Sequence, residues 1–434
     1  MISNFFSLAG IETSFRLADI HSPVKVGIIL TEKCNLSCIF CATECGFDQN
    51  SYNDIISPNM CYEILDQAHK NRVQEIIYSG GEPLMYKFDD LINILEYGRE
   101  RKLKQTIISN GTLINDDNFP ILENLVDVVS ISLHGTKDTH NKITCSDEYE
   151  NTLHTLMLVS NSKKISGSIL YTLNSYNSNY QDFDHVVRLS KELNMELYVA
   201  RGNDLGECSI NESYPVLGNL NKIADRMTSY NNDGYNIKFS NCVPKCVLST
   251  DNQYLATSCS AGVGICSISP RGEVRVCLQS DESLGVISNE NSLSEIWQNK
   301  EIVNFRNMTN ISPYCASCKD LMHCKSGCKL EANGIYQMDT MAKLKISEKW
   351  EEILGKKARI NCRELKITKQ LFWTISHPIC KISINYLEVC KSLMKKRPVV
   401  LNEILNCSDE QISQKDIIML LVFLYEHNLL KFYS

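Results

Sequence analysis

The feature that most constrains the fold is an alternation of short aliphatic runs with amphipathic stretches between Val24 and Arg201. Helical spacing of apolar residues marks the stretches, and Ser57 followed by Pro58 is a start signal for the first of them. Such alternation predicts parallel strands joined by right-handed crossovers. We expect an α/β fold, a partial (β/α)6 TIM barrel, and an open doubly wound sheet is the alternative with the same periodicity. The predicted strands are residues 26–31, 75–79, 105–109, 128–133, 166–172 and 196–200.

The pattern changes after residue 201. A polar, Asn-rich connector reaches about Tyr235, and a turn-rich, cysteine-dense region runs from Cys242 to Cys328. The charged stretch 340–362 is expected to be helical. Beyond it, strands at 371–376 and 429–434 and helices at 384–396 and 413–430 indicate a small winged-helix-like module. The expected organisation is an N-terminal extension (1–23), a barrel (24–235), a cysteine-rich domain (236–362) and this module (363–434).

The composition limits the roles of the cysteines. The chain has 434 residues and 20 cysteines, and a chain of this length buries enough surface to fold without disulfides. The first 25 residues lack the pattern of a secretory signal, so we expect a cytoplasmic protein with reduced thiols. No apolar run is long enough to cross a membrane, and a net charge of -7 gives no reason to bind nucleic acid. Metal ligation and redox chemistry remain.

A first group of cysteines directly follows the first predicted strand. Cys34, Cys38 and Cys41 have the spacing C-x3-C-x2-C on one loop, at the barrel face that carries chemistry. Structural zinc sites usually take four protein ligands. Three thiolates would instead leave one iron of a cubane cluster without a protein ligand. Cys45 is a candidate fourth ligand that would close this site.

A glycine motif follows the second predicted strand, at Gly80, Gly81, Glu82 and Pro83. Together with the cysteine spacing, it makes the sequence resemble the radical SAM superfamily. The resemblance implies that Cys34, Cys38 and Cys41 hold a [4Fe-4S] cluster with an open iron, and that the glycine motif positions S-adenosylmethionine. It also implies cofactor contacts at three residues that follow the third, fourth and sixth strands: Asn110, Ser132 and Arg201.

A second group of cysteines has the spacing C-x12-G-x4-C and, further on, C-x2-C-x5-C-x3-C. This resembles the SPASM domain, which binds auxiliary clusters in radical SAM enzymes that modify peptides and proteins. The resemblance implies two more [4Fe-4S] clusters, with Cys242 and Cys246 as possible substitutes in the ligand set. One cluster would be held by Cys259, Cys266, Cys277 and Cys328, and the other by Cys315, Cys318, Cys324 and Cys362. By spacing alone, a zinc ribbon is the alternative.

The remaining cysteines have no cluster spacing and are interpreted as small apolar side chains in the core. They are Cys61, Cys145, Cys208, Cys380, Cys390 and Cys407.

The two resemblances imply a peptide maturase that crosslinks or otherwise oxidises a ribosomally made precursor peptide. Its electron donor would be a flavodoxin or ferredoxin, and the C-terminal module would bind the peptide's leader. One alternative is a sulfatase-maturing enzyme, but Leu278 occupies the position where that family has an aspartate proposed as a base. Another is a zinc-dependent winged-helix regulator. The general base is unassigned; Asp204, Asp281 and tyrosines at the barrel mouth are candidates.

Overall fold

The structure is a computed structural model. It describes residues 20–45, 54–288, 290–308, 311–312, 315, 318–331, 339–342 and 345, then six C-terminal strands and, between these strands, residues 389, 417, 420, 421 and 424. Two compact units divide the chain: residues 1–241 with 260–309, and residues 242–259 with 310–434. We call them the barrel unit and the cysteine-rich unit and describe each by itself.

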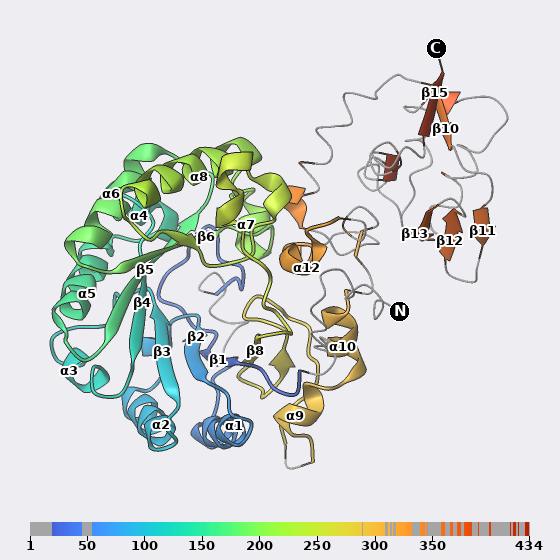
Figure 1. Cartoon of the computed structure of the whole chain (residues 1–434). Coiled ribbons are helices and arrows are strands. Elements are labelled where there is room, and N and C mark those ends of the chain that lie inside the picture. Colours follow the sequence, from blue (N-terminus) through green and yellow to red (C-terminus); the bar gives the residue numbers. More distant parts are fainter. Residues whose placement is uncertain are drawn as a thin grey trace. The chain divides into compact units, whose positions relative to one another are not determined.

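The barrel unit is built on one curved sheet with helices on its outer side (Figure 1). Its strand order is β7-β6-β5-β4-β3-β2-β1-β8-β9, and all pairs from β1 to β7 are parallel. The six expected strands are confirmed as β1 (Lys25–Thr31), β2 (Glu75–Gly80), β3 (Lys104–Ser109), β4 (Val128–Ser132), β5 (Ser166–Leu173) and β6 (Glu196–Arg201). A short strand, β7 (Lys238–Phe239), follows β6 in the sheet.

The strand order distinguishes the two folds that the sequence left open. In a doubly wound sheet the order reverses at a switch point. Here β1 to β6 are neighbours in chain order, as in a barrel, so the partial barrel is confirmed. Most buried residues of these strands are apolar, as expected where helices cover the outer face, but Gln105, Ser130 and Ser168 are buried polar exceptions.

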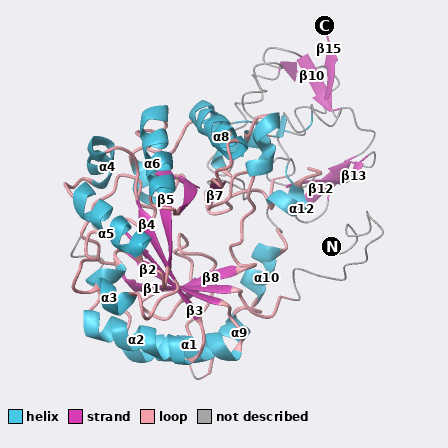
Figure 2. Ribbon diagram, turned by 60° about the vertical axis from the view of Figure 1, so that its left-hand side comes forward, coloured by secondary structure: helices cyan, strands magenta, loops and turns pink. Residues whose placement is uncertain are grey.

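Helices of the barrel unit alternate with these strands (Figure 2). The first begins as the sequence predicts: Ser57 caps α1, and its side chain accepts a hydrogen bond from the Met60 N–H at 3.2 Å. The helices are α1 (Pro58–Lys70), α2 (Phe88–Glu100), α3 (Phe119–Leu122), α4 (Lys137–Thr144), α5 (Tyr149–Asn161), α6 (Tyr180–Glu192), α7 (Gly206–Ile210) and α8 (Leu217–Asn232).

The Asn-rich connector of the sequence analysis is largely helical, so that prediction was wrong. Helix α8 spans most of it and buries Leu220, Ile223, Ala224 and Met227. These residues recur at the i, i+3, i+4 and i+7 spacing of an amphipathic helix. Its four asparagines lie outside this buried stripe and hide the pattern in the composition.

Part of the cysteine-rich sequence belongs to the barrel unit. Strand β8 (Ile265–Ile268) pairs in parallel with β1, and β9 (Val274–Arg275) pairs antiparallel with β8. This β8–β9 hairpin therefore extends the sheet on the side of β1. Two helices follow it, α9 (Leu293–Ile296) and α10 (Lys300–Arg306).

The cysteine-rich unit contains short elements and two small antiparallel sheets. Its helical turns are η3 (Lys245–Val247), η4 (Thr250–Leu255) and α12 (Leu321–Cys324). One sheet has the order β14-β10-β15 and the other β11-β12-β13. The strands are β10 (Lys357–Ile360), β11 (Leu365–Ile367), β12 (Leu371–Thr374), β13 (His377–Ser383), β14 (Val399–Val400) and β15 (Leu430–Tyr433).

These strands test the C-terminal predictions. Strands β12 and β15 confirm the two expected ones, and four described residues of the predicted helix 413–430 are helical and buried: Ile417, Leu420, Leu421 and Leu424. Residues 357–360 of the charged stretch form strand β10, so the prediction of a helix over 340–362 was wrong for these residues. A winged-helix module is not confirmed. Much of the expected helix 384–396 lies outside the described residues. Within the described part of the chain, no helix has the length and apolarity needed to span a membrane.

Candidate functional site

The candidate site lies where the six parallel strands of the barrel unit end. Because parallel strands point the same way, their carboxyl ends lie at one edge of the sheet. The loop with Cys34, Cys38 and Cys41 follows β1, and the glycine motif ends β2. Asn110 follows β3, and two of the other predicted cofactor residues are the last residues of their strands: Ser132 of β4 and Arg201 of β6.

The loop that carries the first three cysteines is fixed by its backbone. Ile39 N–H donates to Ile143 O of α4 at 3.0 Å, and Glu207 N–H of α7 donates to Cys41 O at 2.9 Å. Gly206 has a positive φ of 50°, and a Cβ there would lie 2.7 Å from Cys41 O. Two helices thus hold the loop, and only glycine permits this approach of α7.

The three thiols lie close enough to affect one another. Burial, with smaller contributions from the charges of Glu82 and Cys41, raises the pKa of Cys34 to about 11. Burial also raises the pKa of Cys38 well above its ordinary value, and the charges of Cys41 and Cys34 contribute to this rise. A cationic cluster would offset this cost, because metal ligation deprotonates thiols. The arrangement therefore suits a metal cluster better than free thiols.

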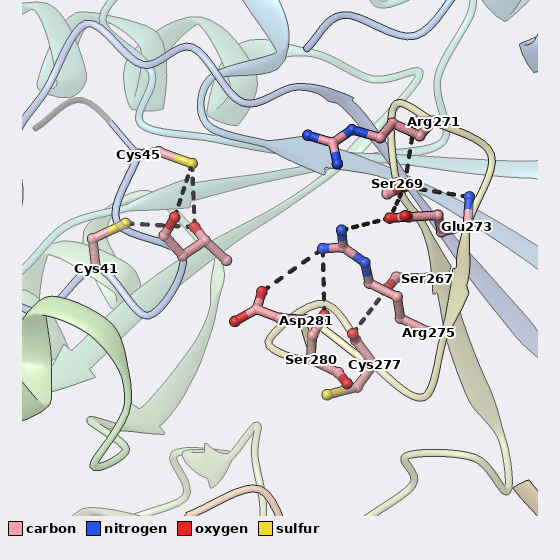
Figure 3. Close-up of polar contacts among 11 residues, drawn as sticks. Cys41, Cys45, Ser267, Ser269, Arg271, Glu273, Arg275, Cys277, Ser280 and Asp281 are labelled. Carbon is pink, nitrogen blue, oxygen red and sulfur yellow. Dashed lines mark hydrogen bonds and ion pairs between the residues drawn. The ribbon is translucent and has the colours of Figure 1, made fainter. Parts of the chain in front are cut away.

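Cys45 contacts this group but differs from its members (Figure 3). Thr43 Oγ1 lies 3.3 Å from Cys45 Sγ and 3.5 Å from Cys41 Sγ. The hydrogen bond with the Cys45 thiol lowers the pKa of Cys41 to about 6 and raises that of Cys45. Cys45 is thus the protonated donor and Cys41 the thiolate. The geometry makes Cys45 a hydrogen-bond partner of the group.

The two glycines of the motif let the end of β2 lie against the cysteine loop. Gly81 N–H donates to Thr31 O, and Glu82 N–H donates to Lys33 O, both at 2.8 Å. A Cβ on Gly81 would lie 2.1 Å from Lys33 O, and Gly80 has a φ of 135°. Any side chain at Gly81 would push this backbone away.

Glu82 is buried and connects β2 to β3. Its carboxylate accepts hydrogen bonds from Ser109 Oγ at 2.8 Å, Asn110 N–H at 2.8 Å and Leu84 N–H at 3.1 Å. Burial raises its pKa to about 6, although these three donors oppose the shift. Because its oxygens are already used, Glu82 positions the motif. Pro83, which is also buried, begins the short helix η2 (Pro83–Met85) that Glu82 caps.

Asn110 connects the end of β3 to the cysteine loop. Its Nδ2 donates to Asn35 Oδ1 at 2.9 Å, and its side chain also hydrogen-bonds the Cys34 sulfur. Ser132 is partly exposed at the mouth, whereas Arg201 is 2% exposed. The structure thus places the predicted cofactor residues at one edge of the sheet, with Asn110 in contact with the cysteine loop.

His134, which the sequence analysis missed, lies beside the cysteine loop. It follows β4, is buried, and its ring centre is 4.7 Å from that of Phe40, between Cys38 and Cys41. Thr172 N–H donates to its Nδ1 at 3.2 Å, and burial holds its pKa well below the ordinary value. The ring is therefore neutral, with its proton on Nε2. The sequence signal that could have identified this residue is a histidine just after the end of a predicted strand.

The β8–β9 hairpin adds a charged network to the barrel unit (Figure 3). Arg275 Nη2 donates to Glu273 Oε2 at 2.9 Å, and its Nη1 lies 3.8 Å from Asp281 Oδ1. The charge of Arg275 also acts on Glu32, just after β1. Cys277 lies on the same hairpin, and its carbonyl accepts from Ser267 Oγ at 2.8 Å. The Asp281 side chain is 95% exposed.

The cysteine-rich unit brings together cysteines that are far apart in the sequence. In one group, the Cys242 thiol hydrogen-bonds the thiols of both Cys259 and Cys328. In a second group, the Cys246 thiol lies within electrostatic range of three thiols, those of Cys315, Cys318 and Cys324. Spacing alone had named Cys242 and Cys246 only as substitutes.

Other predicted cysteines are placed differently. Cys266 is fully buried in β8 of the barrel unit. Burial raises its pKa and the charge of Arg306 opposes this shift, and no other cysteine contributes to it. Cys362, Cys390 and Cys407 lie outside the described residues. Cys61 and Cys208 are buried as expected. Cys145 is exposed and acts electrostatically on Cys38, so its interpretation as a core residue was wrong.

In the part of the chain that the structure describes, no three His, Cys, Asp or Glu side chains are grouped so that they could hold a metal ion.

Comparison with known proteins bears on the same regions. The family model described as the Radical SAM superfamily matches residues 28–189, and the SPASM model, an iron–sulfur cluster-binding domain, matches residues 259–320. A Fe-coproporphyrin III synthase of Methanosarcina barkeri is 30% identical over 114 residues, which is 26% of this chain and 28% of that protein. The first curated relatives are matched over 28–41% of their own length.

Longer matches come from two other proteins. The mycofactocin maturase MftC of Mycolicibacterium smegmatis is 20% identical over 329 residues, covering 71% of this chain and 79% of that protein. The crystal structure of Streptococcus suis SuiB bound to S-adenosylmethionine aligns with a TM-score of 0.61 at 19% identity, over 74% of this chain and 77% of that one. The likeness to SuiB shows that the fold is shared.

Proposed function

We propose that the chain is a radical SAM enzyme with a SPASM iron–sulfur domain, and that it is a maturase that oxidatively modifies a ribosomally synthesised peptide, because the two family models match residues 28–189 and 259–320. One observation supports the radical step most directly: the loop with Cys34, Cys38 and Cys41 lies against the glycine motif at the mouth of the barrel. The zinc-dependent regulator is set aside, because the radical SAM match includes both the loop and the motif.

The residues present fit the cofactors of this family. Cys34, Cys38 and Cys41 would hold a [4Fe-4S] cluster, and the fourth sulfur nearby, on Cys45, is engaged with Cys41 and Thr43. An iron would thus stay open for the amino and carboxylate groups of S-adenosylmethionine. With both bound, these cofactors would supply the one-electron chemistry that cleaves the sulfonium and removes a hydrogen atom from a peptide C–H.

The chain's own residues would position this chemistry. Gly80 and Gly81 keep β2 against the cluster loop, and Glu82 fixes the start of the following helix. Asn110 holds the loop through Asn35 and Cys34. Asn110, Ser132 and Arg201 lie at the mouth and would contact the cofactor. These contacts would orient the reactants and exclude water, as the chemistry of a carbon radical requires.

A peptide is the proposed substrate. The relatives named as maturases support it: MftC is similar over 71% of this chain, and the sporulation killing factor maturation protein SkfB of Bacillus subtilis is 28% identical over 29% of it. SuiB, which shares the fold, has also been crystallised with its precursor peptide SuiA. We propose that the product is a crosslink or a similar oxidised bond.

The residue after Cys277 bears on the choice between maturase types. Leu278 packs so closely on β1 that a Cβ at Gly27 would lie 2.8 Å from Leu278 Cδ2. This apolar side chain stands at the position where sulfatase-maturing enzymes have an aspartate proposed as a base, so the carboxylate is missing here. This favours peptide crosslinking over oxidation of a sulfatase.

Closing a bond after hydrogen abstraction leaves one proton and one electron to be removed from the peptide. We propose that two auxiliary [4Fe-4S] clusters, held with the cysteines of the SPASM domain, accept this electron. A cytoplasmic flavodoxin or ferredoxin would supply the electron that begins the reaction. The C-terminal strands would bind the leader by adding a peptide strand at an exposed edge.

The test is anaerobic reconstitution with iron and sulfide, followed by dithionite and S-adenosylmethionine. We expect 5′-deoxyadenosine and methionine by liquid chromatography and mass spectrometry. A peptide encoded beside the gene should then lose two hydrogen atoms in mass. The Cys34, Cys38 and Cys41 to Ala triple variant is the control. Wild-type protein that binds iron but forms no 5′-deoxyadenosine would contradict the proposal.

A further inference from the structure

Cys242 and Cys246 lie in a short segment between the two family matches, which end at residue 189 and begin at residue 259. The segment precedes and enters the helical turn η3 (Lys245–Val247) of the cysteine-rich unit. Neither residue has a place in the cysteine spacing of the SPASM motif, yet each is placed beside a different group of cysteines.

Cys242 is at the centre of the first group. It is 7% exposed, and its thiol hydrogen-bonds both Cys259 and Cys328. Three sulfurs therefore converge from segments that lie 17 and 69 residues apart along the chain (259 − 242 = 17; 328 − 259 = 69). Thiols gather in this way when they share a metal group or a disulfide, and none of these three cysteines forms a disulfide.

Cys246 takes the equivalent place in the second group. The residue is exposed at the surface, but its sulfur lies deep enough among protein atoms for desolvation to raise its pKa. The next causes include the thiols of Cys315, Cys324 and Cys318. The charges of Cys324 and Cys318 also act on Cys315, and that of Cys318 acts on Cys324. The four sulfurs thus lie within electrostatic range of one another, and four is the number that a closed [4Fe-4S] cluster takes.

The backbone between the two cysteines is fixed against both groups. Val243 exchanges two hydrogen bonds of 3.2 Å with Thr257, two residues before Cys259. Lys245 Nζ donates to Asp320 Oδ1 at 3.0 Å, and its backbone N–H donates to the Cys324 sulfur. These contacts fix the position of the segment without using the thiols of Cys242 and Cys246 themselves.

The turn at Gly327 contacts the same segment. A Cβ there would lie 2.6 Å from Pro244 Cγ, so the turn that precedes Cys328 packs directly on the residues between Cys242 and Cys246. Its φ of 69° is a second reason for glycine. This contact brings the end of the sequence C-x2-C-x5-C-x3-C back to a segment about 80 residues earlier in the chain.

We propose that Cys242 and Cys246 are cluster ligands, Cys242 with Cys259 and Cys328, and Cys246 with Cys315, Cys318 and Cys324. One five-residue segment would then connect the two auxiliary clusters. Cys246 would take the place that the SPASM resemblance gave to Cys362. The inference rests on the auxiliary clusters of the proposed function.

The test compares iron and sulfide content in single variants of the full chain, reconstituted anaerobically. Cys246→Ala should lose about four iron and four sulfide of about twelve each, and with them the electron paramagnetic resonance signal of one cluster. Cys362→Ala should keep all three clusters. Cys61→Ala is the matched control, because Cys61 is fully buried and burial alone shifts its pKa.

Two further measurements keep the test decisive. If Cys246→Ala fails to fold, Cys246→Ser retains an oxygen ligand and should shift the g values of one cluster; unchanged g values would overturn the proposal. Loss of a cluster in Cys362→Ala, with none lost in Cys246→Ala, would overturn it as well. Formation of 5′-deoxyadenosine is measured in parallel, so failure of the radical step and failure of the ligand assignment are told apart.

Discussion

The cysteine loop of the barrel unit and the cysteine groups of the other unit are assembled in different ways. Cys34, Cys38 and Cys41 come from eight consecutive residues of one loop, and its neighbours hold it by backbone hydrogen bonds. The groups around Cys242 and Cys246 each combine distant segments. A local loop supplies three ligands and leaves room for a substrate, whereas converging segments can supply four and close a site.

The largest expected effect is on 5′-deoxyadenosine formation, which should depend on the barrel loop and not on the cysteine-rich unit. Cys38→Ala removes the most enclosed thiol of the loop and should reduce 5′-deoxyadenosine to background, with about a third of the iron lost. Cys324→Ala should lose a similar amount of iron but still form 5′-deoxyadenosine. Iron analysis and mass spectrometry measure both. Equal loss of 5′-deoxyadenosine in the two variants would show that the regions are not independent.

The next effect tests how the loop is held. In Gly81→Ala the new Cβ would lie 2.1 Å from Lys33 O, a backbone atom that cannot rotate away. The strain should cost about 1–3 kcal/mol or more and displace Cys34, so most 5′-deoxyadenosine formation should be lost. Gly218→Ala is the control, because its Cβ would meet nothing within 4 Å. Full activity of Gly81→Ala would contradict the close approach.

The difference between the regions also explains what the sequence could predict. The six barrel strands and α1 were predicted nearly to the residue, because burial and capping repeat locally. The position of the cysteine loop was predicted for the same reason, because its three cysteines lie within eight residues and directly follow a strand. His134 beside Phe40 was missed, because the contact joins two loops that no spacing relates.

The second region could not be predicted in this way. The position of Cys242 beside Cys259 and Cys328 depends on how the chain returns at Gly327, which is a tertiary contact. The SPASM resemblance named Cys266 as a ligand, and the structure places this residue inside β8. Strand β8 reads as a cysteine-rich turn in the sequence because its partner, β1, is more than 200 residues away.

A pH effect in the barrel unit should be smaller. Burial raises the pKa of Glu82 to about 6, above the 4.5 of a free carboxyl, so the folded state binds more protons between these values. Glu82 thus stabilises the fold below pH 4.5 and loses this contribution as the pH rises through 6, a change of about 2 kcal/mol. The unfolding free energy of wild type minus that of Glu82→Gln should fall by this amount.

Denaturant unfolding of the apoprotein at several pH values measures that difference. Glu100→Gln, on the exposed end of α2, is the control and should leave the pH dependence of wild type unchanged. A difference between wild type and Glu82→Gln that rises with pH would show that its three donors outweigh burial.

The smallest effect concerns the fourth sulfur of the barrel loop. In the apoprotein the Cys45 thiol stabilises the Cys41 thiolate, so Cys45→Ala should raise the pKa of Cys41 from about 6 toward the ordinary value of about 8.5. The rate of alkylation as a function of pH measures this shift. In the reconstituted protein the iron content and 5′-deoxyadenosine formation should stay unchanged, because Cys45 donates to a ligand without being one. If Cys45→Ala instead lost the cluster, the loop would be a closed four-thiolate site like those of the cysteine-rich unit, and the contrast between the two regions would fail.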